Sequence, residues 1–223
     1  MSEYTDLINV FNGRAAFYEL FTEVFNEAPN DNILKAVAAF APHFRNMAEE
    51  IDDASLKAGA DELTELLKTS TDLTELNRSF TTLFLLGSSS VPTAESVYLS
   101  TTKLLKQEPW DEIIDFYYKH NFGLPEEMKQ TEEHISSEML FMYYLSAKTA
   151  TALANNSEDE AEGLIDAQLE FMEQHIIRWI PEMCDIIAKS AYEHVGFYKT
   201  IAKLLKGFLF YDVELLKELT SEG

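Results

Sequence analysis

The stretch TDLINVFNGRAAFYELFTEVFNE, residues 5–27, decides the fold class of this 223-residue chain. Its apolar residues recur three and four positions apart, the spacing that places side chains on one face of an α-helix. They are Leu7, Val10, Phe11, Phe17, Leu20, Phe21, Val24 and Phe25. Because this spacing continues through nearly every later segment and strand-like alternation is almost absent, the sequence predicts an all-α protein.

Capping and breaking residues predict where each helix begins or ends. After the first helix, over residues 4–27, we predict a helix from Asn30 or Asp31 kinked at Pro42, one opened by Asp52-Asp53 and one opened by Thr71-Asp72. The next predicted helices cover residues 95–107, 109–121 and 126–154, and Gly123 is the predicted C-cap of the second. A helix over 157–180 follows, with a Ser157–Glu160 capping box at its start and a turn at Pro181. Residues 182–219 form one bent helix or two short helices in this prediction. These segments predict a single-domain bundle of about nine or ten helices, with a loop that can act as a hinge at residues 87–94.

The composition is that of a folded, strongly acidic protein. Apolar residues make up 46% and aromatic residues 12% of the chain. The 17 Lys and Arg against 39 Asp and Glu give a formal net charge of −22. Phosphate groups are bound by Lys and Arg, so this charge argues against nucleic-acid and anionic-membrane partners. It favours a cationic partner, such as a peptide that carries Arg or Lys.

The sequence predicts a cytoplasmic location. Cys184 is the single cysteine, which excludes an intramolecular disulfide and fits a reducing compartment. The first residues lack the basic and apolar segments of a signal peptide. No run approaches the ~20 apolar residues needed to span a bilayer.

The sequence offers no support for an enzyme or for a metal or cofactor site. None of the five histidines has a Glu three residues before it, so the Glu-x-x-His pairs of di-iron bundles are absent. Glycine-rich phosphate-binding motifs are also absent. Acidic neighbours of Cys184 would raise its thiol pKa and make it a poor nucleophile. We therefore expect no catalytic residues, no metal and no cofactor.

Two stretches carry the candidate binding residues. In the first, helical spacing would align Gln130, His134, Glu138 and Phe141 on one face, either as solvated surface or as a polar pocket for a guanidinium group. In the second, His175 is one turn before Trp179, in a stripe that core packing also explains. Upstream of it lies an acidic strip, which is either a solvated face or a surface that attracts a basic peptide: Glu158, Glu162, Asp166 and Glu170.

Taken in order with other segments, these stretches resemble the TorD/DmsD/NarJ family of cytoplasmic molybdoenzyme chaperones. The similar segments are Arg14-Ala15-Ala16-Phe17-Tyr18-Glu19-Leu20-Phe21, Pro29-Asn30-Asp31-Asn32-Ile33-Leu34, Leu83-Phe84-Leu85-Leu86-Gly87, Val91-Pro92, Glu95-Ser96-Val97-Tyr98 and Phe122-Gly123-Leu124. In the family motif Glu-Gln-Pro-x-Asp-His-x-x-x-Glu-Leu-x-Phe-Met, the matching residues are Gln130, His134, Glu138, Phe141 and Met142; a C-terminal His-x-x-x-Trp-x-Pro element matches at His175, Trp179 and Pro181. Lys129, Thr131, Glu133 and Met139 depart from the motif.

The resemblance implies a chaperone of anaerobic respiration rather than an enzyme. Such proteins bind the twin-arginine signal peptide, or an N-terminal segment, of a molybdopterin-dependent oxidoreductase and hold the apo-enzyme until its cofactor is inserted. Some members exchange helices between protomers, so we expect a monomer or a helix-swapped dimer. Two alternatives stay open: a guanine-nucleotide-binding helical protein, and a generic acidic adaptor for basic peptides.

The family resemblance leads to a specific hypothesis for the peptide site. Glu133 and Glu138 would accept the guanidinium charge, and Gln130 and His134 would shape the polar end of the site. The apolar part would be lined by Pro92, Tyr98 and Trp179, with His175 beside Trp179. Ser96 would cap the helix that follows the loop.

Overall fold

The computed structural model describes residues 4–69, 72–87 and 90–221. It is all-α, as predicted: these residues contain helices α1 to α10 and, in place of strands, a single isolated bridge between Ala94 and His134. The helices are α1 (Thr5–Asn26), α2 (Asp31–Glu50), α3 (Ala54–Thr69), α4 (Leu73–Phe80), α5 (Glu95–Leu99), α6 (Glu108–Lys119), α7 (Ile135–Ala154), α8 (Glu158–Phe171), α9 (Ile177–Ala188) and α10 (Gly196–Ser221). Shorter turns are the π-helical Thr81–Leu85 and Met172–Ile176 and the 3₁₀ turn Glu193–Val195.

The chain divides into two compact units. Unit 1 consists of Met1–Thr22, Ala94–Trp179 and Asp212–Gly223, and unit 2 consists of Glu23–Thr93 and Ile180–Tyr211. The boundaries between the units therefore fall inside three helices, α1, α9 and α10. The loop predicted at residues 87–94 lies at one boundary, but Ser88 and Ser89 are outside the described residues.

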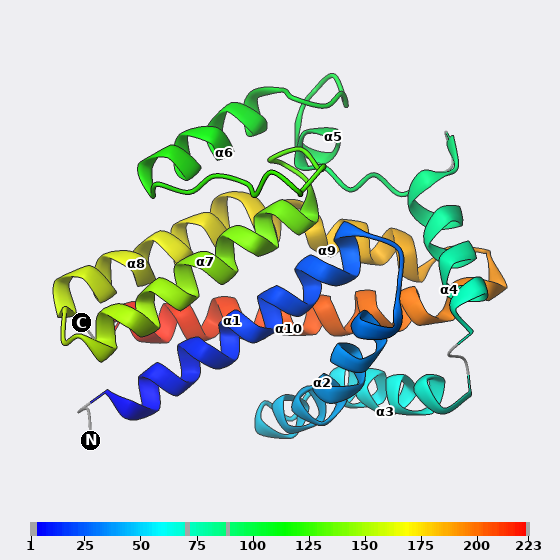
Figure 1. Cartoon of the computed structure of the whole chain (residues 1–223), viewed down its shortest axis with the longest axis horizontal. Helices are drawn as coiled ribbons and strands as arrows, with labels where there is room; N and C mark the ends of the chain where they lie inside the picture. The colour runs from blue at the N-terminus through cyan, green and yellow to red at the C-terminus, as the bar shows by residue number, and fades with distance from the viewer. Residues whose placement is uncertain (1–3, 70–71, 88–89, 222–223) are drawn as a thin grey trace. The chain divides into compact units, whose positions relative to one another are not determined.

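Unit 1 has an aromatic core between α6, α7 and α8, and Figure 1 shows α7 and α8 running alongside each other. The ring of Phe141 on α7 lies 4.7 Å from Tyr117 and 4.8 Å from Phe171, centroid to centroid. Phe116 packs edge-on against Phe171 at 5.3 Å. These four rings are buried. The Phe141–Phe171 and Phe116–Phe171 pairs are edge-to-face, a favoured arrangement for aromatic rings, and the Phe141–Tyr117 pair is tilted. These contacts hold the three helices together.

A buried polar network also joins helices within unit 1. Arg14 on α1 donates from Nε and Nη2 to the two carboxylate oxygens of Asp212 on α10, at 2.6 and 2.9 Å. Its Nη1 donates to Gln168 of α8 at 2.5 Å, and Gln168 also accepts from Ser146 of α7 at 2.9 Å. Tyr18 donates its hydroxyl to Asp212 at 2.5 Å. A charge-assisted network of this kind fixes the register of the four helices.

Unit 2 has a separate aromatic core. Phe84 lies 5.2 Å from Tyr198 and from Phe80, and 6.0 Å from Phe25. Helices α2 and α3 pack against each other in the same unit. Phe25, Phe80 and Tyr198 are buried, so unit 2 has a core of its own.

Several predicted helix starts are confirmed by capping contacts. The Asn30 side chain accepts from Asn32 N and Ile33 N at the start of α2. Asp53 accepts from Ser55 N and Leu56 N at the start of α3, and Asp72 caps α4 through Thr74 N. Thr71, the other residue of that predicted start, lies outside the described residues.

The prediction of one helix over 126–154 is wrong at its N-terminal end. Helix α7 begins at Ile135, and the segment before it contains turns but no helix. The side-chain bond from Ser137 Oγ to the Thr131 carbonyl (2.7 Å) favours this non-helical path. Gln130 therefore does not share a helix face with His134 and Glu138.

The prediction of a helix over 95–107 is also wrong. Helix α5 ends at Leu99, and Lys103 and Lys106 adopt left-handed conformations with φ of 57° and 55°. The Ser100 hydroxyl accepts from Lys103 N at 3.1 Å, which replaces a helical hydrogen bond by a local one. Residues 100–107 therefore form an ordered loop.

Three predicted helix ends differ in detail. Asn121, not Gly123, takes the left-handed conformation after α6, with φ of 54°. Ser157 stands at the N-cap of α8 but makes no side-chain cap bond, so the capping box is not formed. Pro181 lies inside α9, which continues to Ala188, so the turn predicted at this proline is not formed.

Candidate functional site

The N-terminus of α7 places the histidine of the family motif. His134 is the N-cap of this helix: its Nδ1 accepts from Ser136 N at 3.2 Å and lies 2.7 Å from Ser136 Oγ. Burial lowers the pKa of His134 to about 4, because the charged imidazolium is poorly solvated there. His134 is therefore neutral near pH 7 and acts as a hydrogen-bond acceptor at the helix start.

Glu133 connects this turn to α5 and to the loop after it. Its side chain is fully buried, and its two oxygens accept from Ser96 N at 3.0 Å and from Lys106 N at 2.7 Å. Its own carbonyl accepts from Glu95 N at 3.0 Å. Both carboxylate oxygens thus already have backbone partners, which is the arrangement of a carboxylate that orders a loop.

The predicted role of Ser96 as a helix cap is wrong. The N-cap of α5 is Ala94, whose side chain cannot accept a hydrogen bond. The free backbone N–H of Ser96 at this helix start is instead bonded to the Glu133 carboxylate. The Ser96 hydroxyl instead accepts from Gln107 N at 3.1 Å. Ser96 and Glu133 therefore fasten the two ends of residues 96–107 together.

Glu138, one turn into α7, faces the C-terminal aromatic element of the motif. Its Oε2 accepts from the indole Nε1 of Trp179 at 3.1 Å, and the Tyr98 ring lies 5.2 Å from the Trp179 ring. The other oxygen, Oε1, is buried and has no hydrogen-bond partner. Burial, followed by the nearby charge of Glu95, raises the pKa of Glu138 well above its ordinary value.

His175 pairs with a carboxylate that the sequence did not single out as a site residue. Its Nδ1 lies 3.2 and 3.1 Å from the two oxygens of Glu95, and its Nε2 is buried without a partner. Both side chains are fully buried, and burial raises the pKa of Glu95. A signal for Glu95 was present, because this acidic residue stands at the start of the Glu95-Ser96-Val97-Tyr98 segment that resembles the family.

Most of the predicted site residues come together in unit 1, on α5, on α7 and the turn before it, and on α9 with the π-helical turn before it. These are Ser96, Tyr98, Glu133, His134, Glu138, His175 and Trp179. Gln130 also belongs to unit 1 but lies half-buried in a bend before α7. Pro92 belongs to unit 2. Together with Glu95, the clustered residues form the buried acidic site.

The buried acidic site contains three carboxylates and few cations. Glu95, Glu133 and Glu138 are fully buried, and the one ion pair that any of them makes among the described residues is that of Glu95 with His175. Arg178 affects Glu95 electrostatically but is exposed and lies beyond ion-pair distance. Such a site suits a ligand that brings positive charge and several hydrogen-bond donors.

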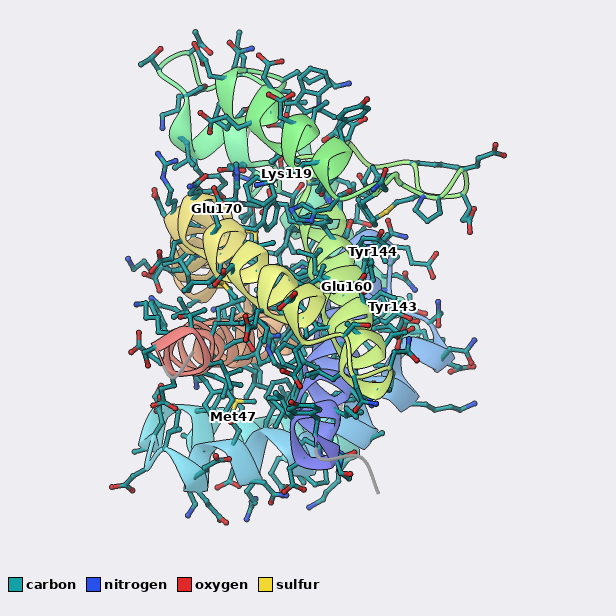
Figure 2. All side chains as sticks on the ribbon, turned by 90° about the vertical axis from the view of Figure 1, so that its left-hand side faces the viewer. Met47, Lys119, Tyr143, Tyr144, Glu160 and Glu170 are labelled. Atoms are coloured by element: carbon teal, nitrogen blue, oxygen red, sulfur yellow. The ribbon has the colours of Figure 1, made fainter. Side chains whose placement is uncertain are left out.

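The acidic strip on α8 is exposed, as a solvated helix face would be. Figure 2 labels Glu160 and Glu170 on this helix, and Lys119 at the end of α6 lies near Glu170. The Lys119 Nζ is 3.9 Å from a Glu170 oxygen, an exposed ion pair of small energetic weight. This surface can contribute long-range attraction for a basic partner but forms no defined site.

Other site classes find no support in the described residues. They contain no group of three His, Cys, Asp or Glu side chains arranged to hold a metal ion. None of the helices in residues 4–69, 72–87 and 90–221 is long and apolar enough to cross a membrane. Burial raises the pKa of the Cys184 thiol, which leaves it in the unreactive protonated form.

Comparisons with known proteins agree with the motif. The family model for the nitrate reductase delta subunit matches residues 49–185, a range that holds every predicted site residue. The chaperone protein TorD of Aliivibrio salmonicida (strain LFI1238) is 28% identical over 217 residues, 94% of this chain and 97% of that protein. TorD of Aliivibrio fischeri (strain ATCC 700601 / ES114) is 32% identical over 144 residues; the match spans 64% of each chain, less than two thirds of that relative.

A solved structure shares the fold. A crystal structure described as that of a redox enzyme maturation protein from Archaeoglobus fulgidus aligns with a TM-score of 0.53 at 19% identity. The alignment covers 86% of this chain and 93% of the other. At this identity the likeness concerns the fold.

Proposed function

This chain belongs to the nitrate reductase delta subunit family, which is the TorD/NarJ family of chaperones, and we propose that it is a maturation chaperone and not an enzyme. Its client would be a molybdopterin-dependent oxidoreductase of anaerobic respiration. It would act in the cytoplasm. There it would bind the twin-arginine signal peptide, or an N-terminal segment, of the apo-enzyme and hold it until the cofactor is inserted.

The buried acidic site is the observation that carries this proposal. It lies at the motif positions of the resemblance and contains three buried carboxylates, of which only Glu95 forms an ion pair among the described residues, with His175. An arginine guanidinium stays charged at all physiological pH values and donates up to five hydrogen bonds in a planar fork. A paired-arginine peptide therefore supplies the charge and the donors that the site lacks.

The apolar residues of the site fit the segment that follows the arginines in such a peptide. The Tyr98 and Trp179 rings, tilted against each other at 5.2 Å between centroids, offer an apolar wall beside Glu138. Pro92 and Gln130 remain proposed contacts at the edges of the peptide. Aromatic rings of this kind contribute large contact area at little conformational cost.

The net charge supports the same partner. A formal charge of −22 and the exposed carboxylates of α8 attract a basic peptide before contact. This attraction is screened over about 8–10 Å at physiological salt, so it affects the association rate more than the final geometry.

Titration calorimetry with twin-arginine leader peptides of molybdoenzymes tests the function, each peptide beside its Lys-Lys counterpart. We expect binding of the paired-arginine form with a preference of about tenfold or more, since lysine cannot reproduce the bidentate geometry. Equal affinity for both forms would indicate a generic adaptor for basic peptides. Absence of binding to every leader would contradict the proposal.

The oligomeric state belongs to the same proposal. We propose a monomer that can also form a helix-swapped dimer, as the resemblance implies. Light scattering after size-exclusion chromatography distinguishes the two species by mass. A stable higher oligomer as the main species would contradict this part of the proposal.

A further inference from the structure

Two polar atoms in the buried acidic site have no partner. They are Glu138 Oε1 and His175 Nε2, which belong to fully buried side chains. An unsatisfied buried polar atom loses its hydration without gaining a hydrogen bond in return, so native structures rarely keep one without a reason. Here the two atoms belong to neighbouring carboxylate–partner pairs, Glu138 with Trp179 and His175 with Glu95.

The charges of the two pairs are also incompletely balanced. Among the described residues, the Glu138 side chain has one hydrogen-bond partner, the indole N–H of Trp179, which brings no charge, and Glu95 has one imidazole. The two carboxylates lie close enough that the charge of Glu95 raises the pKa of Glu138. One cation placed between them would relieve this repulsion and satisfy Oε1 at the same time.

We propose that Glu138 and Glu95 form the subsite that receives an arginine guanidinium, and that Glu133 does not touch the ligand but keeps the subsite closed. This inference rests on the proposed function and divides the acidic residues of the site into two roles. The pair Glu138 and Glu95 offers carboxylate oxygen to the ligand. Each oxygen of Glu133 already accepts from a backbone N–H group, whereas Glu138 Oε1 accepts from none, so Glu138 is the better placed of the two to receive a donor from the ligand.

The segment that Glu133 holds has little regular structure and few buried side chains. It runs over residues 95–107 and contains the five-residue helix α5 and a loop in which the backbone of Lys103 and Lys106 is in the left-handed conformation. The loop presents Leu104 and Leu105 to solvent, 62% and 53% exposed. A segment with backbone strain and few buried side chains opens at low free-energy cost. Because Glu95 and Glu138 are fully buried, a ligand reaches them when this segment shifts.

Isosteric amide variants separate the two roles. Glu138→Gln and Glu95→Gln remove a ligand carboxylate, so we expect each to weaken binding of the paired-arginine peptide at least about tenfold, the usual loss for a charged hydrogen bond. Each should also reduce the preference over the Lys-Lys peptide. Glu127→Gln, at an exposed position before α7, removes the same charge as a matched control and should leave the affinity within about twofold.

Glu133→Gln tests the closing role. An amide can accept from one backbone N–H but not from both, so one of the bonds to Ser96 N and Lys106 N is lost. We expect faster amide hydrogen exchange in residues 95–107 and faster peptide association, with the arginine preference retained. In the wild-type protein, bound peptide should slow exchange in the same residues, a readout that needs no variant to fold.

The outcomes distinguish this inference from the proposed function. If the wild type binds the paired-arginine peptide but Glu138→Gln and Glu95→Gln bind it equally well, the subsite is wrong and the function stands. If Glu133→Gln loses the arginine preference while exchange in residues 95–107 is unchanged, Glu133 is a ligand contact and the closing role is wrong. If the wild type binds no leader, the function itself fails.

Discussion

His134 shows how one residue of the motif acts on structure before any ligand is present. Its buried Nδ1 caps α7 through Ser136 N, and the same helix carries Glu138 one turn later. The cap therefore positions the carboxylate that we propose binds arginine. A helix cap contributes typically about 1 kcal/mol to stability.

We predict that His134→Ala lowers the free energy of unfolding at pH 7 by about 1 kcal/mol, while His134→Asn, which can accept the same backbone bond, retains most of it. Urea denaturation followed by circular dichroism measures both. An alanine variant as stable as the wild type would mean that the cap contributes nothing.

The lowered pKa of His134 predicts that the free energy of unfolding depends on pH. Its pKa is about 4 in the folded protein against an ordinary 6.5, so the unfolded chain binds a proton between these values and the folded protein does not. The stabilisation from His134 is complete above pH 6.5 and is lost as the pH falls toward 4, with an upper bound of about 3 kcal/mol.

Glu95 and Glu138, whose pKa values are raised, contribute with the opposite sign, since their contribution is greatest below their ordinary pKa and is lost as the pH rises. The difference between wild type and His134→Asn isolates the histidine. Because the two proteins are similarly stable at pH 7 and asparagine does not titrate, the wild type should become steadily less stable than His134→Asn as the pH falls from 7 to 4. A difference that stays constant over this range would contradict the assignment.

At the residue scale, the sequence singled out Glu133, His134, Glu138, His175 and Trp179, which the structure brings together in unit 1; their part in peptide binding stays a prediction. The sequence could not reveal the contacts of Glu133, because its partners are backbone N–H groups 27 and 37 residues away, which every residue type except proline has. It indicated no role for Glu95, because the partner of this carboxylate, His175, lies 80 residues further along the chain.

At the scale of helices, the Arg14–Asp212 pair joins α1 to α10 inside unit 1. Both side chains are almost completely buried, and Gln168 and Tyr18 satisfy remaining hydrogen bonds of the pair. Removing one partner leaves a buried charge without compensation, which is far more costly than losing an exposed ion pair.

We predict that Asp212→Asn lowers the free energy of unfolding by about 3–5 kcal/mol. Lys217→Ala, which removes the exposed pair with Glu214 on the same helix, should leave stability unchanged. Chemical denaturation of both variants provides the comparison. Equal, small effects would show that the buried network does not hold the helices.

Helix existence was predictable from the sequence, and helix ends were less so. Apolar spacing identified α1, α2, α3 and the body of α7, since it depends on each helix burying one face. The short α5 and the turns before α7 were missed because their conformation depends on contacts from Glu133 and Ser96 to distant backbone. Local propensity does not contain such contacts.

At the scale of the whole molecule, the single-domain organisation remains a prediction. The two units have separate aromatic cores, but α1, α9 and α10 each contribute to both units. A continuous helix cannot melt in one half without fraying the other, which favours cooperative unfolding.

We therefore expect one thermal transition in scanning calorimetry, with equal calorimetric and van't Hoff enthalpies. Two transitions, or a calorimetric enthalpy well above the van't Hoff value, would show that the units unfold independently.

The whole-molecule charge and the buried acidic site make different contributions to peptide binding, and salt separates them. Attraction by the net charge of −22 is screened at high ionic strength and does not distinguish arginine from lysine. Bidentate bonding to buried carboxylates does distinguish them and is screened much less.

The most direct measurement is the ratio of Lys-Lys to Arg-Arg peptide dissociation constants, determined for the wild-type protein at about 0.15 M and about 1 M salt. A chaperone that recognises paired arginine through its buried acidic site should keep a ratio of about ten or more at both salt concentrations while both affinities fall. A ratio near one at high salt would contradict specific arginine recognition and leave only electrostatic attraction of basic peptides.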